Sequence, residues 1–74
     1  MIVKNNNKFI NEKHLKNIIN NIKKYVRENV EIEKIELDTF ARVIMSLNNQ
    51  KYICTFDYNI YEVDLLTCNK LKEE

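Results

Sequence analysis

Two acidic residues near the carboxyl end of the chain have the spacing of a catalytic pair. Glu62 and Asp64 lie two positions apart, and residues with this spacing in an extended strand point to the same side. Two adjacent carboxylates can exchange protons with a substrate or share a metal ion. The pattern places no histidine, cysteine or third carboxylate beside them. We therefore expect no catalytic residues and no metal ligands here.

The thiols and the imidazole are the other reactive side chains. Cys54 and Cys68 are fourteen positions apart and are the only cysteines, and His14 is the only histidine. A structural zinc site needs four ligands, and a disulfide framework needs several cysteine pairs. The sequence therefore predicts two reduced thiols, with Cys54 in the core opposite Val63 and Cys68 accessible. His14 is predicted to lie at the surface of a helix.

The absence of glycine excludes several classes of enzyme. The 74 residues contain no glycine, proline or tryptophan. Phosphate-binding loops, dinucleotide-binding turns and nucleophile elbows use glycine where the backbone turns sharply or approaches a ligand. We therefore expect a non-enzymatic protein that uses no cofactor and no small-molecule substrate.

The amino-acid composition is typical of one folded domain and indicates the kind of genome that encodes it. Hydrophobic residues make up 45% of the chain and charged residues 31%, which is typical of a globular domain, here residues 1–74. Asparagine, lysine and isoleucine fill 32 positions, and their A/T-rich codons point to an AT-rich genome such as that of a phage or mobile element. No apolar stretch is long enough for a membrane span or a secretory leader, so we expect a cytoplasmic protein without membrane contact.

Residues 12–28 are predicted to form one amphipathic helix. Apolar side chains recur at spacings of three and four from Leu15 to Val26, which is the helical period. Asn11 directly precedes this stretch and can cap the free backbone N–H groups. The helix therefore presents one apolar face to a partner layer.

The period falls to two after the helix, which is typical of strands. A two-residue turn at Asn48–Asn49 places Leu47 opposite Gln50 and aligns two strands, so that Ile44 pairs directly with Ile53. A second turn at Tyr58–Asn59 aligns the next strand in the same way. Residues 30–38 are predicted to form a further strand. A three-residue connection at residues 38–40 places Leu37 and Ile35 beside Ala41 and Val43, and a bulge around Glu33 and Lys34 keeps the other apolar residues on the same face.

These elements predict an α+β fold in which one helix covers a four-stranded antiparallel meander in the order αββββ. Residues 1–9 are expected to form a loose arm or a short edge strand, and residues 69–74 a frayed charged tail. The predicted core consists of Leu15, Ile18, Ile19, Ile22, Val26, Val43, Met45, Leu47, Tyr52, Cys54, Phe56, Tyr61, Val63 and Leu65.

Charge divides the chain into two parts. Residues 1–29 carry seven cations and two anions, and residues 30–68 carry three cations and seven anions. The cations of the helix lie on one side of it, as in helices that contact nucleic-acid phosphates. The residues of this candidate nucleic-acid surface are Lys13, Lys16, Lys23, Lys24 and Arg27.

The sheet face opposite the helix is the other candidate surface. Its predicted residues combine apolar side chains with a charged rim, which is the composition of a protein interface. They are Phe40, Arg42, Ile44, Lys51, Ile53, Asp57, Ile60, Glu62 and Asp64. An uncovered edge strand offers a further place for a partner to pair.

Two functions follow from these surfaces. The first is a protein-binding module or inhibitor that uses the open sheet face and edge strand, because a core this small favours a partner subunit or homodimer. The alternative is a nucleic-acid-binding regulator that uses the basic side of the helix.

Overall fold

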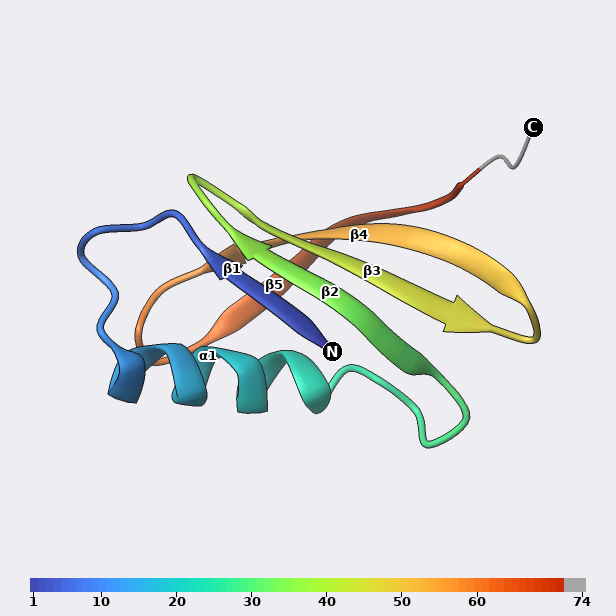
Figure 1. Ribbon diagram of the computed structural model, residues 1–74, viewed down its shortest axis with the longest axis horizontal. Coiled ribbons are helices and arrows are strands. Elements are labelled where there is room, and N and C mark those ends of the chain that lie inside the picture. Colours follow the sequence, from blue (N-terminus) through green and yellow to red (C-terminus); the bar gives the residue numbers. More distant parts are fainter. Residues whose placement is uncertain (72–74) are drawn as a thin grey trace.

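The computed structural model describes residues 1–71 and contains one helix and one five-stranded sheet (Figure 1). The strands lie side by side in chain order, so the sheet is a meander apart from the crossover that contains the helix. The elements are β1 (Ile2–Asn5), α1 (Glu12–Lys23), β2 (Glu31–Leu37), β3 (Ala41–Leu47), β4 (Gln50–Tyr58) and β5 (Val63–Lys70). The predicted α+β class and the αββββ order are confirmed.

Strand β1 adds a fifth strand to the four-stranded sheet that was predicted. β1 pairs in parallel with β2, with Val3 opposite Ile35, and α1 connects the two strands across one sheet face (Figure 1). The amino-terminal segment therefore contains the short edge strand rather than only a loose arm. At the other end, Asn69 and Lys70 belong to β5 and are not frayed, while residues 72–74 lie outside the described part of the chain.

The helix begins where predicted but ends earlier. The Asn11 side chain accepts a hydrogen bond from the backbone N–H of His14 at 2.9 Å, which is the expected cap. The helix ends at Lys23 rather than at residue 28. Beyond it, Tyr25 and Val26 donate to carbonyls three residues back, which tightens the last turn. The Tyr25 hydroxyl then donates to the Val63 carbonyl at 2.9 Å, which is a tertiary contact just beyond the last helical residue.

The β3–β4 hairpin has the predicted register. Leu47 lies opposite Gln50 and Val43 opposite Cys54. Asn48 and Asn49 have φ angles of 51° and 65°, in the left-handed region that two-residue hairpin turns require and that asparagine tolerates. Asparagine thus supplies the left-handed turn conformation that glycine often supplies in other hairpins.

The pairing of β2 is also as predicted. Leu37 lies opposite Ala41, and the register shifts between Ile32 and Lys34, which is the expected bulge. Because of this extra residue, Ile32 packs against the same core as Ile35.

The predicted register of β5 is wrong by four residues. Val63 lies opposite Tyr58 rather than Cys54. A four-residue loop replaces the two-residue turn, because the Asn59 side chain accepts hydrogen bonds from the backbone N–H groups of Tyr61 and Glu62. Tyr61 consequently lies 82% exposed in the loop, and Leu65 is 46% exposed. Both were predicted to be core residues.

The cysteines differ from the prediction as well. The shifted register places Cys54 directly opposite Cys68, with their Cα atoms 4.0 Å apart, and the two form a disulfide. Reduced thiols were expected because the sequence spacing alone does not reveal cross-strand neighbours. Cys54 is buried, as predicted, whereas Cys68 is exposed.

The core lies between α1 and the sheet face beneath it. The helix contributes Ile18 and Ile22, and Tyr25 packs edge-on against Phe56 with ring centroids 5.4 Å apart. The buried residues are Ile18, Ile22, Ile35, Leu37, Ala41, Val43, Met45, Cys54, Phe56 and Val63. The β3–β4 hairpin and the carboxyl end of β5 extend past the end of α1 (Figure 1).

We predict that Phe56→Ala lowers the free energy of unfolding by about 3–5 kcal/mol, because it leaves a cavity at the centre of a small core. Chemical denaturation followed by circular dichroism measures the change. Phe9→Ala is the matched control, because Phe9 is 90% exposed, and it should change the value by less than about 0.5 kcal/mol. Equal losses in the two variants would contradict this assignment of the core.

Candidate binding surface on the open sheet face

The centre of the open sheet face is an apolar cross-strand pair. Ile44 on β3 lies directly opposite Ile53 on β4, and both side chains are half-buried although α1 covers the other face. They line a hollow of about 110 Å³ together with Lys34, Glu36 and Arg42. The predicted contact between the two isoleucines is therefore present, and charged side chains surround it.

Ion pairs form the rim of this hollow. The Glu36 carboxylate accepts a hydrogen bond from the Arg42 guanidinium at 3.0 Å and lies 3.6 Å from the Lys34 ammonium. Neighbouring strands supply these charges, because Glu36 lies opposite Arg42 in the β2–β3 ladder. These ion pairs fix the positions of the three side chains around the isoleucines, and the Glu36 carboxylate offsets part of the positive charge of Lys34 and Arg42.

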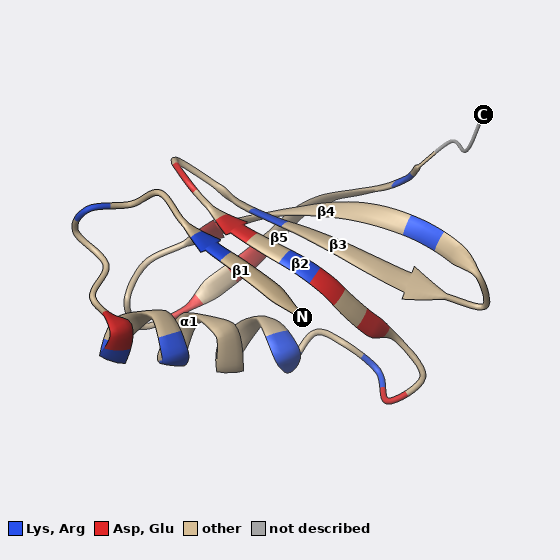
Figure 2. Ribbon diagram, viewed as in Figure 1, with Lys and Arg blue, Asp and Glu red and all other residues tan. Residues whose placement is uncertain are grey.

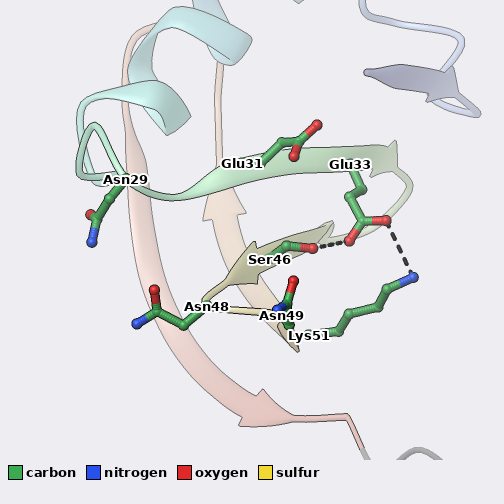
Figure 3. A pocket seen from close by; sticks show the side chains of 7 residues that line it. All are labelled: Asn29, Glu31, Glu33, Ser46, Asn48, Asn49 and Lys51. Atoms are coloured by element: carbon green, nitrogen blue, oxygen red, sulfur yellow. Dashed lines mark hydrogen bonds and ion pairs between the residues drawn. The ribbon is translucent and has the colours of Figure 1, made fainter.

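A second hollow of about 440 Å³ lies at the hairpin end of the same face. Figure 3 shows the Glu33 carboxylate between Ser46 and Lys51, which are contributed by β3 and β4. The Ser46 hydroxyl donates to Glu33, and the Lys51 ammonium lies 3.3 Å from the same carboxylate. Hydrogen bonds from Ser46 and then Lys51 hold the pKa of Glu33 below its ordinary value of 4.5.

A third hollow, of about 290 Å³, lies at the opposite end of the face beside the β2–β3 connection. Phe40 and Arg42 line it together with Thr55, and Phe40 is 43% exposed. The three hollows follow β3 from Ser46 through Ile44 to Arg42. Hollows on this face thus form a row along one strand.

The structure brings together seven of the nine residues predicted for this surface. Phe40, Arg42, Ile44, Lys51 and Ile53 line the three hollows. Asp57 and Asp64 lie directly opposite one another at the margin formed by β4 and β5, and like charges in this position destabilise strand pairing.

Ile60 and Glu62 do not belong to this surface, and the prediction that included them is wrong. Both lie in the loop between β4 and β5, which the Asn59 side chain shapes. Asn21 of α1 donates to the Tyr61 carbonyl of the same loop at 3.1 Å. Glu62 is therefore not on a strand beside Asp64, so the carboxylate pair suggested by their spacing does not form.

Sequence reasoning missed the residues that organise the rim. Glu33, Lys34 and Glu36 were not assigned to the interface, although all three take part in its ion pairs. The predicted register of Leu37 opposite Ala41 already placed Glu36 opposite Arg42, and this was the signal that could have found it.

The basic residues form a separate surface. Lys13, Lys16 and Lys23 lie on α1, and Lys24 and Arg27 lie in the connection between α1 and β2. All five are exposed, and none forms a salt bridge within residues 1–71. Figure 2 shows blue segments on and after the helix and red segments concentrated on β2. The helix side thus carries mostly cations, whereas the cations of the open sheet face are paired with carboxylates of β2.

The remaining reactive groups do not assemble into a site. His14 is half-buried, and its Nδ1 atom is buried without a hydrogen-bond partner. Across residues 1–71, no three side chains of histidine, cysteine, aspartate or glutamate gather where they could hold a metal ion.

Comparisons with protein-family models, curated proteins and solved structures find no match to this chain. The described residues include no helix with the length and apolar character needed to cross a bilayer.

We predict that Ser46→Ala raises the pKa of Glu33 toward its ordinary value, because the hydrogen bond from Ser46 is the largest single cause of the lowered pKa. The lowered pKa stabilises the fold above about pH 4.5, and this contribution is lost as the pH falls through the pKa of the folded state. Ser46→Ala should therefore reduce the loss of stability in acid. NMR titration of the side-chain carboxyl groups measures the pKa, and an unchanged Glu33 titration would contradict the contact.

Proposed function

We propose that this chain is a small non-enzymatic protein-binding module that acts through its open sheet face. The observation that carries this proposal is the Ile44–Ile53 pair in a hollow bounded by Lys34, Glu36 and Arg42. An apolar centre inside a charged rim is the usual composition of a protein interface. Ion pairs already formed in the free chain lower the entropy cost of presenting that rim to a partner.

The edge strand β5 extends the proposed surface. Leu65 and Leu66 are 46% and 50% exposed, and after Val63 every side chain of β5 is exposed. An uncovered edge with apolar side chains is suited to pair with a strand of another chain. We include homodimerisation and the occlusion of a partner protein, as an inhibitor does, in this proposal. Cytoplasmic location and origin in a phage or mobile element remain predictions.

The paired substitution Ile44→Lys with Ile53→Glu tests the open face. Because the two residues lie directly opposite, the new charges can pair across the strands and preserve the sheet. We expect the variant to lose self-association, measured by light scattering, and to lose the proteins that the wild-type chain captures from a lysate. Its circular dichroism spectrum should be unchanged.

The matched control is Lys13→Glu with Lys16→Glu, which changes charge on the helix and leaves the sheet face intact. This control should associate and capture as the wild-type chain does. If the sheet variant retained the same associations as the control, the open face would be excluded as the binding surface.

A second candidate function is nucleic-acid binding by α1. It is favoured by the exposure of Lys13, Lys16, Lys23, Lys24 and Arg27 and by their lack of ion pairs within the described chain. Cations already engaged with carboxylates are less available to phosphates, whereas these five are free to release counterions from a duplex.

We predict that binding to a random DNA duplex, if it uses these cations, weakens by about 10²- to 10³-fold between about 50 and 200 mM salt. Substitution of Lys16, Lys23 and Lys24 by glutamate should abolish it. The control replaces Lys4, Lys8 and Lys70 by glutamate, which gives the same net charge with the helix intact, and it should retain most of the binding. Equal losses in the two triple variants would show dependence on net charge alone and remove the helix hypothesis.

A further inference from the structure

The two cysteines join the outermost strand to the body of the sheet. Cys54 of β4 and Cys68 of β5 lie directly opposite and form a disulfide. Their surroundings differ, because Cys54 is 2% exposed in the core whereas Cys68 is exposed on the edge strand. One sulfur is thus anchored in the packed interior, and the other lies on a strand that solvent reaches.

The amino-terminal end of β5 has independent anchors. Val63 is buried, and its carbonyl accepts a hydrogen bond from the Tyr25 hydroxyl at 2.9 Å. The preceding loop is bound to α1 through Asn21 and the Tyr61 carbonyl. None of these contacts involves either cysteine.

The carboxyl-terminal end of β5 has no such packing. From Asp64 to Lys70 every side chain is exposed. The register shifts within this stretch, because Thr55 lies opposite Thr67 and Phe56 opposite Leu65, which leaves Leu66 as an unpaired bulge residue. Beyond this bulge, the strand is held by ladder hydrogen bonds, by the bond from the Leu71 N–H to the Lys51 carbonyl and by the disulfide. This half also lies past the end of the helix (Figure 1).

We propose that the Cys54–Cys68 disulfide is a redox-controlled clamp on the edge strand. In the oxidised chain, β5 pairs with β4 along its whole length. In the reduced chain, residues 67–70 separate from β4 with the bulge at Leu66 as the hinge, while Val63 stays in place. The separation exposes the backbone edge of β4 between Lys51 and Thr55.

The chemistry is thiol–disulfide exchange with a small dithiol as the reductant. A thiolate of the dithiol attacks the Sγ of Cys68, the exposed residue of the pair, a new sulfur–sulfur bond forms, and Cys54 leaves as a thiolate that takes up a proton. The second thiol of the reductant then attacks its own first sulfur and releases Cys68. Two electrons and two protons pass to the protein, and the reductant becomes a cyclic disulfide.

Amide hydrogen exchange of the full chain, with and without dithiothreitol, tests this proposal. Mass spectrometry confirms the two states, because the oxidised chain is lighter by about 2 Da. We expect the amides of residues 67–70 and their partners on β4 to exchange at least about tenfold faster after reduction, with β2 and β3 unchanged, because local opening sets the exchange rate.

The variant Cys68→Ser is the matched control, since an exposed serine keeps the size of the side chain and cannot form the bond. It should show the exchange of the reduced wild-type chain and ignore dithiothreitol. The proposal is overturned if oxidised and reduced chains exchange alike at residues 67–70, if the air-oxidised chain keeps two free thiols, or if the control still responds to the reductant.

Discussion

Burial of one sheet face beneath a single helix is the contact on which this molecule depends. Ile18 and Ile22 are the only fully buried residues of α1, and they pack on a sheet face centred on Val43 and Phe56. Within residues 1–71, α1 is the only helix, so no second layer of the described chain covers the opposite sheet face. The size of the helix therefore determines which parts of the sheet are packed and which need another means of support.

The parts of the sheet that α1 does not cover are held by local interactions instead. Ion pairs from Glu36 and Glu33 connect three strands across the open face. Asn48 and Asn49 close the long hairpin in left-handed conformations, and the disulfide of Cys68 joins the edge strand to β4. Each interaction is modest by comparison with core burial, and together they maintain strands that have solvent on both sides.

The two candidate surfaces differ in how their charges are compensated. On the open face, carboxylates of β2 neutralise cations of β2, β3 and β4 around the isoleucine pair, which favours contact with a protein of mixed polarity. On the helix side, cations such as Lys16 and Lys23 have no carboxylate partner within residues 1–71, which favours a polyanion. The fold separates these properties because a helix on one sheet face presents its polar side away from the other.

Hydrophobic period and short turns were sufficient to predict the helix start, the bulge in β2 and the β3–β4 register, because each depends on neighbours a few residues apart. The same reasoning found the Ile44–Ile53 contact. It failed for the end of α1, for β5 and for the cysteines. Tyr25 reaches Val63 across 38 positions of the chain, and Asn59 sets a loop whose length shifts the whole strand. The Tyr25 contact and the cysteine pairing depend on segments that meet only when the helix and sheet have come together. The loop at Asn59 is local, but its hydrogen bonds come from a side chain and leave no trace in the hydrophobic period.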